Sequence, residues 1–263
     1  MKKFGVLIFL IFAAGVLAAL FVIVKYPYQL PSQLWRAKVA VGGEGADQAG
    51  KEVVVRTFPF STATSLAEWD EKVFSGKSTQ YSLESYQNKD CVKAVSFDSA
   101  SALYYRERIP LEKETFVSWY WAPGEFPIRK AQEDLSEKDE YDFVAQVYVI
   151  FHASFYLNAK AIMYVWTADL PVGTVSVSPY TDNVKILVLQ SGPSDGWKFE
   201  KRDVKKDYLE LFGEPLKKDI MAISFMTDSD STETQAVAYY SDITIGYVSD
   251  QVPEENNKNE VEK

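Results

Sequence analysis

Apolar and polar positions divide the chain into one long apolar run at the start and many short apolar runs after it. The long run spans Phe4 to Val24 and contains no charged residue and no proline. About 20 apolar residues are enough for a helix to cross the ~30 Å hydrocarbon core of a bilayer. The run therefore predicts a transmembrane helix within residues 1–25.

The residues around this run predict its orientation. Lys2 and Lys3 precede it and favour a cytoplasmic N-terminus. A cleaved secretory signal has an apolar stretch of about 7–15 residues, and here the run is longer and no polar segment follows Ala18 and Ala19. We expect a single-pass signal anchor in the cytoplasmic (inner) membrane, with the C-terminal domain outside the cytoplasm. Secretion after signal cleavage is the alternative.

The short runs define a domain between two polar segments. Residues 26–50 contain Pro27 and Pro31 and end in a glycine-rich stretch, which is typical of a linker. Residues 251–263 are polar and acidic and have nothing to bury, so they predict a disordered tail. The folded domain is expected over residues 51–250.

Within that domain, short runs rich in β-branched and aromatic residues alternate with turn residues and predict strands. The expected strands are Glu52–Phe58, Gln80–Ser85, Cys91–Phe97, Ser101–Arg108, Phe116–Trp121, Phe143–Phe151, Ala161–Thr167, Val184–Leu189, Trp197–Val204, Ile220–Thr227 and Gln235–Tyr247. Helical patterns occur only at Leu66–Phe74 and at Lys205–Phe212, which is followed by Gly213. The pattern predicts an all-β, two-sheet sandwich or jelly roll with one or two short helices.

Several blocks of residues, in this order and at this spacing, resemble a bacterial family. They are Ser99–Leu103, Trp119–Trp121, Asp142–Phe151, Tyr164–Trp166, Trp197–Glu200 with Arg202 and Val204, Asp207-Tyr208 before Phe212-Gly213, Met226–Thr232 and Tyr239–Ile243. The family is domain of unknown function thirty-forty-seven (DUF3047). The resemblance implies a β-sandwich similar to galactose-binding-like modules and no established activity. Tyr141 stands where the family tends to have a second Asp, and Gln146 stands where an Arg is common.

Composition excludes some functions. The net charge of −9 argues against nucleic-acid binding, which needs clustered Lys and Arg. Cys91 is the only cysteine, so a disulfide within the chain and a Cys-based zinc site are ruled out. His152 is the only histidine and no Gly-x-Ser-x-Gly motif occurs, which leaves no recognisable serine-hydrolase motif. The acidic stretch from Glu125 to Asp142 is expected to be an exposed loop.

Aromatic residues at alternate strand positions are the candidate ligand-binding residues. Trp119 and Trp121 share one strand face, as do Tyr164 and Trp166 on another strand. Aromatic rings beside polar groups can bind sugar rings, and the same pattern fills the core of a sandwich. The core interpretation is the better supported of the two for this pattern. With Asp142 and Arg202 added as polar groups, these residues form the predicted binding site.

Asp228 and Asp230 place carboxylates at alternate positions, which suits a hard cation such as calcium. The alternative is a turn whose side chains cap their own backbone. A structural calcium is therefore the one cofactor that the sequence suggests.

Three functions remain open. The first is a non-catalytic, membrane-anchored module that binds a glycan or another envelope component. The second is a carboxylate-dependent enzyme that acts on polysaccharide, because paired carboxylates are the groups that hydrolyse glycosidic bonds. The third is a structural or assembly protein of the envelope. For the fold, we predict burial of Trp69, Phe97, Trp119, Val147, Val149, Phe151, Val165 and Ile223.

Overall fold

The computed structural model describes residues 51–249, apart from 113, 140 and 155–157. The predicted transmembrane segment 1–25, the linker 26–50 and the tail 251–263 lie outside these residues. No helix among the residues described has the length and apolarity needed to cross a membrane.

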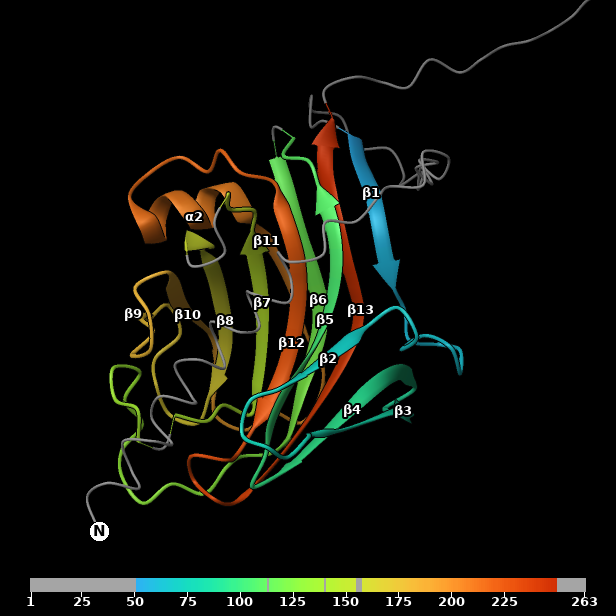
Figure 1. The fold of residues 1–263 in the computed structure, drawn as a ribbon. Helices are drawn as coiled ribbons and strands as arrows, with labels where there is room; N and C mark the ends of the chain where they lie inside the picture. Colours follow the sequence, from blue (N-terminus) through green and yellow to red (C-terminus); the bar gives the residue numbers. More distant parts are fainter. Residues whose placement is uncertain (1–50, 113, 140, 155–157, 250–263) are drawn as a thin grey trace, which may run out of the picture.

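Two β-sheets make up the domain and face each other, as Figure 1 shows. The six-stranded sheet has the order β11-β6-β13-β4-β3, with β1 paired to β13. Its strands are β1 (Lys51–Phe58), β3 (Gln80–Tyr86), β4 (Lys89–Phe97), β6 (Glu114–Glu125), β11 (Lys198–Asp203) and β13 (Gln235–Ser249). The arrangement confirms the predicted all-β, two-sheet sandwich.

The seven-stranded sheet has the order β2-β5-β12-β7-β8-β10-β9. Its strands are β2 (Asp70–Val73), β5 (Ala100–Ile109), β7 (Ala145–Phe151), β8 (Ala161–Thr167), β9 (Val175–Val177), β10 (Val184–Ser191) and β12 (Ile220–Asp228). The pairing of β8 with β10 is parallel, whereas the other pairings described are antiparallel. All seven residues of β8 are buried, which agrees with a strand that is covered on both faces.

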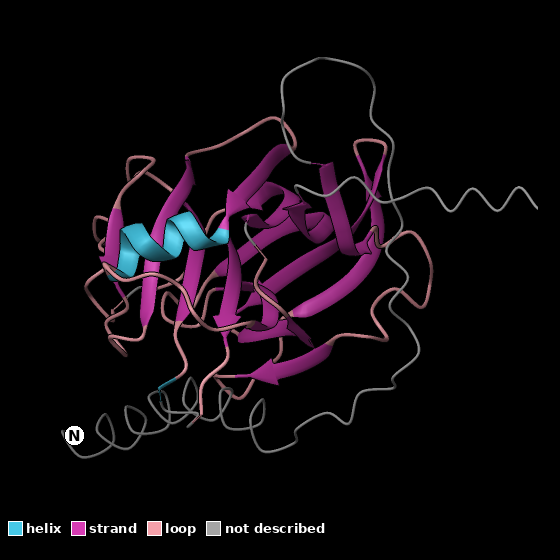
Figure 2. Ribbon diagram, turned by 90° about the horizontal axis from the view of Figure 1, so that it is seen from above, coloured by secondary structure: helices cyan, strands magenta, loops and turns pink. Residues whose placement is uncertain are grey.

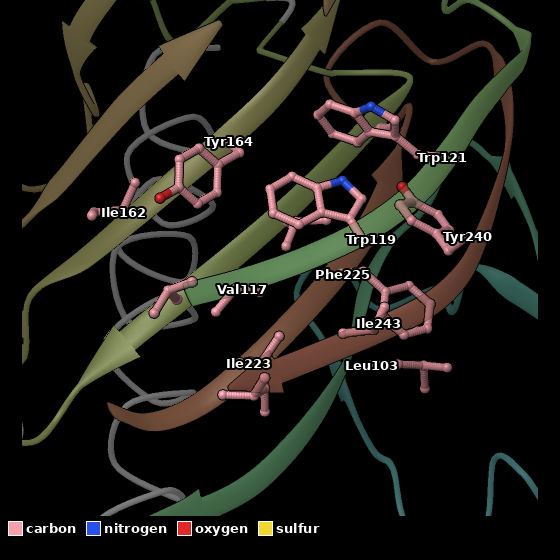
Figure 3. Packing of buried hydrophobic residues seen from close by; sticks show 14 of the residues in the cluster. Leu103, Val117, Trp119, Trp121, Ile162, Tyr164, Ile223, Phe225, Tyr240 and Ile243 are labelled. Atoms are coloured by element: carbon pink, nitrogen blue, oxygen red, sulfur yellow. The ribbon is translucent and has the colours of Figure 1, made fainter. Parts of the chain in front are cut away.

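The main core lies between the sheets (Figure 3). Alternate residues of β6 and β13, such as Val117 and Tyr240, point from one sheet toward Ile162 and Phe225 of the other. A second cluster of buried apolar side chains lies on the outer face of the seven-stranded sheet. It includes Met163 and Val165 of β8, and Leu135 and Phe143 cover it. The seven-stranded sheet is therefore packed on both faces.

One helix, α2 (Val204–Phe212), is found among the residues described (Figure 2). Asp203 caps its start by accepting hydrogen bonds from the backbone N–H groups of Lys205 and Lys206. Gly213, at φ +70°, ends it in the left-handed conformation that glycine adopts at little cost. The predicted helix over Lys205–Phe212 is confirmed.

Three expectations about local structure are wrong. The helix expected over Leu66–Phe74 is instead a series of turns followed by β2, because pairing with β5 outweighs the helical spacing. Phe97 is 70% exposed, since it lies on the outer face of the six-stranded sheet at the end of β4. The acidic stretch is not simply exposed: Glu133 is buried, pairs with Arg129 at 2.8 Å and accepts backbone hydrogen bonds from Ala168 and Asp169.

Candidate functional site

The four aromatic residues predicted to bind a ligand lie in the core. Trp119, Trp121, Tyr164 and Trp166 are at most 1% exposed. Ring centroids of Trp119 and Tyr164 lie 5.3 Å apart, and those of Trp121 and Trp166 lie 5.5 Å apart. The inward faces of β6 and β8 thus meet across the sandwich, as Figure 3 shows for Trp119 and Tyr164. This corrects the prediction of a binding face at these residues and favours the core alternative.

Arg202, a further predicted ligand-binding residue, stabilises the fold. Its Nε and Nη2 atoms donate to the two carboxylate oxygens of Asp207 at 2.8 and 2.6 Å. The Tyr164 hydroxyl donates to the same carboxylate at 2.7 Å. Burial, together with the negative charge of Asp207, raises the pKa of Tyr164 well above its usual value. The three side chains join β11, α2 and β8.

Asp142 is fully buried and holds a loop in place. Its Oδ1 accepts a hydrogen bond from the backbone N–H of Ser231 at 3.1 Å, and its Oδ2 accepts one from Thr232 at 2.6 Å. Both carboxylate oxygens therefore bind the turn that leads into β13. This structural role was not evident from the sequence, because Asp142 and the turn are far apart in the chain.

Asp142, Asp228 and Asp230 form what we call the carboxylate cluster, in which one oxygen of each lies within 4.8 Å of the others. Oδ1 of Asp228 accepts hydrogen bonds from the backbone N–H of Phe143 at 2.7 Å and from Nε2 of Gln146 at 2.6 Å. Burial, reinforced by the neighbouring acids, raises the pKa of Asp228 well above its usual value. The same causes, burial first, raise the pKa of Asp230 to about 7. A calcium ion at Asp228 and Asp230 stays a prediction.

A cavity of about 120 Å³, which we call the outer cavity, opens beside this cluster on the outer face of the seven-stranded sheet. Small residues line its floor, because Ala100 and Ala102 occupy alternate positions of β5 and leave room above the sheet. Larger side chains and two of the acids form its walls. They include Tyr104, Tyr141, Tyr148, Tyr180, Met163, Met226, Asp228 and Asp230. The Ser99–Leu103 block contains the small residues, but the sequence did not show which strands lie beside it.

A second surface feature, which we call the aromatic row, crosses the outer face of the six-stranded sheet. Its members are Tyr86, Tyr120, Trp197, Phe199 and Tyr239. Tyr86 stacks on Tyr239 with ring centroids 3.9 Å apart and an interplanar angle of 3°, and Trp197 packs edge-on against Tyr86 at 5.8 Å. Phe199 lies opposite Tyr120 in the strand register and is 52% exposed.

Polar groups border the aromatic row. A shallow hollow beside Trp197 is lined by Gln190, Ser194, Asp195 and Lys198. On the other side, Nζ of Lys89 lies 4.0 Å from the centroid of the Tyr120 ring and 2.6 Å from a carboxylate oxygen of Asp242. Sequence reasoning missed the row because its members come from β3, β6, β11, β13 and the segment before β11, whose order in the sheet is not readable from the chain.

A family model described as "Protein of unknown function (DUF3047)" matches residues 67–244. The chain belongs to the DUF3047 family. The match covers more than half of the 263 residues and confirms the resemblance seen in the sequence. No curated protein matches the chain.

Some solved structures are similar to this DUF3047 protein. The family 11 carbohydrate-binding module of the cellulase Lic26A-Cel5E from Clostridium thermocellum is 10% identical, with 76% of this chain and 96% of that chain covered and a TM-score of 0.40. The CBM22-1 xylan-binding domain of Xyn10C from Paenibacillus barcinonensis is also 10% identical. The match covers 78% of this chain and 99% of that chain, with a TM-score of 0.38. The xyloglucanase domain of NopAA from Sinorhizobium fredii is 10% identical. The match covers 67% of this chain and 92% of that chain, with a TM-score of 0.39.

Tyr141 and Gln146, the two positions at which the sequence resemblance predicts a departure from the family, both lie near Asp228 in this DUF3047 protein. Tyr141 forms part of the wall of the outer cavity. Gln146 donates to Asp228 and accepts a hydrogen bond from the Tyr148 hydroxyl at 2.7 Å. Both side chains are therefore part of the surroundings of Asp228.

Proposed function

We propose that the protein is a membrane-anchored, extracytoplasmic module that binds a glycan or another component of the cell envelope without catalysis. The observation that carries the binding proposal is the aromatic row, a set of partly exposed rings that spans several strands of one sheet. Phe199 is more than half exposed. Exposed aromatic surface on an otherwise well-packed domain is typical of an interaction site.

The chemistry of the row suits sugar rings. The C–H faces of a sugar are apolar and stack on aromatic rings, which combine a large apolar surface with polar edges in Tyr and Trp. Sugar hydroxyls need donors and acceptors beside the rings, and the polar hollow next to Trp197 supplies an amide, a hydroxyl, a carboxylate and an ammonium group. A protein partner with an apolar surface would use the rings but not this polar border.

The anchoring part of the proposal depends on the sequence. Lys2 and Lys3 before the apolar run of residues 4–24 favour export of everything after it. A reporter that is active only outside the cytoplasm, fused after Asp250, should be active. Activity of a cytoplasm-only reporter at the same position would contradict the proposed topology.

A carboxylate-dependent polysaccharide-acting enzyme is the second candidate, and the carboxylate cluster is the observation that favours it. An acid whose pKa lies near 7, as for Asp230, could serve as a general acid. Both oxygens of Asp142 are already bound to backbone N–H groups, however, and the neighbouring cavity is small. Hydrolysis of an envelope polysaccharide that is lost in Asp230→Asn would favour the enzyme.

The binding proposal is tested by titrating the full chain with glycans selected from a glycan array. We expect Trp197→Ala and Phe199→Ala to weaken binding about tenfold or more, which corresponds to about 1.4 kcal/mol. Phe97→Ala is the matched control, because Phe97 is an exposed aromatic residue on the outer face of the same sheet but outside the row. Equal affinities for all three variants and the unchanged protein would remove the aromatic row as the binding site.

A further inference from the structure

We propose that the outer cavity is a second binding site, on the opposite sheet from the aromatic row, for a small organic ammonium ion. Asp228 and Asp230 would face the positive charge of the ligand, and the tyrosine rings would surround its alkyl groups. The ligand class is an aliphatic amine or a quaternary ammonium compound. The proposal does not depend on glycan binding at the aromatic row.

The charge inside the cavity is the first argument. Asp228 and Asp230 both line it, and neither takes part in an ion pair among the residues that the structure describes. Arg129, whose charge acts on Asp142 in the cluster, is bound to Glu133 and to the backbone oxygen of Asp142. Lys72 lies on the cavity wall, on β2, but among the described residues it forms no ion pair with either acid. Buried carboxylates without a cation are costly unless they bind a proton or a positively charged ligand.

The aromatic wall is the second argument. Four tyrosines line the cavity, and the faces of aromatic rings attract cations, an effect that grows when water is excluded. Two of these rings already contact a cation of the protein. Cζ of Arg106 lies 5.4 Å from the centroid of the Tyr104 ring, and Nζ of Lys138 lies 5.3 Å from that of Tyr180. A ring of aromatic residues with carboxylates at one side is the arrangement that binds ammonium groups in aromatic cages.

Hydrogen bonds fix the position of an aromatic ring of the cavity wall relative to a carboxylate. The hydroxyl of Tyr148 donates to Oε1 of Gln146 at 2.7 Å, and Nε2 of the same Gln146 donates to Asp228 at 2.6 Å. Tyr148 and Asp228 lie on the adjacent strands β7 and β12. The ring and the carboxylate are therefore positioned before a ligand arrives, which reduces the entropy lost on binding.

The lining suits an organic cation better than a metal ion. Calcium takes about 6–8 oxygen ligands, whereas much of this cavity wall consists of tyrosine rings and of apolar side chains such as Met163 and Met226. Both oxygens of Asp142 already accept backbone hydrogen bonds. The cavity of about 120 Å³ is also below the ~300–1,000 Å³ of sites for larger ligands, so a single small ion is expected.

The test uses the full chain and calorimetric titration with choline and with n-butylammonium chloride. The control ligand is 3,3-dimethylbutan-1-ol, which has the shape of choline but no charge, and calcium chloride is titrated separately. We expect saturable binding of at least one ammonium ion, with the neutral alcohol at least tenfold weaker. Equal binding of the alcohol, or saturable binding of calcium without binding of either ammonium ion, would overturn the proposal.

Variants locate the site. At pH 8, above the pKa of about 7 of Asp230, Asp230→Asn removes a charge but keeps the shape of the side chain, and it should weaken ammonium binding at least tenfold. Glu210→Gln, at an exposed acid of α2 outside the cavity, is the control and should leave the affinity unchanged. Tyr148→Phe keeps the ring, and its affinity for the ammonium ion should lie within about threefold of that of the unchanged protein. Tyr148→Leu should lose most of the affinity.

Unchanged binding in Asp230→Asn and Tyr148→Leu would refute the site. The comparison of choline with the alcohol decides the case if a variant fails to fold. Trp197→Ala should bind the ammonium ion normally, which separates this site from the aromatic row.

Discussion

Replacing Trp119 by Ala tests the packing between the two sheets. The side chain is fully buried, and its ring centroid lies 5.4 Å from that of Trp121 and 5.3 Å from that of Tyr164. Truncating a buried Trp to Ala costs about 3–5 kcal/mol, because apolar surface is lost and a cavity remains. Each aromatic pair adds about 0.5–1.5 kcal/mol to what is lost.

One contribution has the opposite sign. The indole Nε1 of Trp119 has no hydrogen-bond partner among the residues described, and a buried polar group without a partner costs about 1–3 kcal/mol. Removing it returns part of that cost, so the net loss for Trp119→Ala should stay at about 3–5 kcal/mol and not exceed it. Trp119→Phe keeps a ring and removes the unpaired N–H, and it should cost clearly less than the Ala variant.

The assay is urea unfolding of the full chain in mild detergent, followed by far-UV circular dichroism. A lower midpoint at an unchanged slope reports a loss of stability. Phe97→Ala, at a side chain that is 70% exposed, is the control and should change the free energy of unfolding by less than about 1 kcal/mol. A loss of less than about 1 kcal/mol for Trp119→Ala would refute the placement of Trp119 in the core.

Three further predictions concern other parts of the domain. Gly246→Ala should cost about 1–3 kcal/mol in thermal or urea unfolding, because a Cβ there would lie 2.5 Å from the backbone oxygen of Val53 and 2.6 Å from the Phe116 ring. Asp203→Ala should cost about 0.5–2 kcal/mol through loss of the cap of α2, and Asp203→Asn should recover most of it. Burial raises the pKa of Asp230 from 3.8 to about 7, so the folded state binds a proton that the unfolded state releases. Its contribution to stability is then full below the lower pKa and is lost as the pH rises through about 7, and Asp230→Asn should flatten the pH profile of the unfolding midpoint.

Features that depend on neighbouring residues in the chain could be predicted from the sequence. The run Phe143–Phe151 predicted the strand β7, and Gly213 indicated the end of α2. The helical spacing over Leu66–Phe74 gave a wrong result, because Trp69 instead packs against Phe58 and Phe225 from distant strands. Local spacing carries no information about such partners.

The candidate sites were harder to predict for the same reason. The pairs Trp119 with Trp121 and Tyr164 with Trp166 share faces as expected, but period-2 spacing does not say whether a face turns inward or outward. Phe97 and Phe199 are also aromatic residues at strand ends, and only the order of strands in the sheet puts Phe199 beside Tyr120. The pairing of Asp228 with Asp230 was visible in the sequence, whereas the position of Asp142 next to them was not.

The pairing of β1 with β13 has a consequence for how the domain can be connected to other proteins. Lys51, at the start of β1, is the register partner of Ser249, at the end of β13. Opposite residues in an antiparallel pair lie only about 4.5–5.5 Å apart, so the folded unit enters and leaves at nearly one point. Units with adjacent ends are well suited to insertion into a surface loop of a host protein and to circular permutation. Residues 51–249 could thus be carried as a cassette within another chain, with the outer cavity on the opposite sheet from the two junction strands.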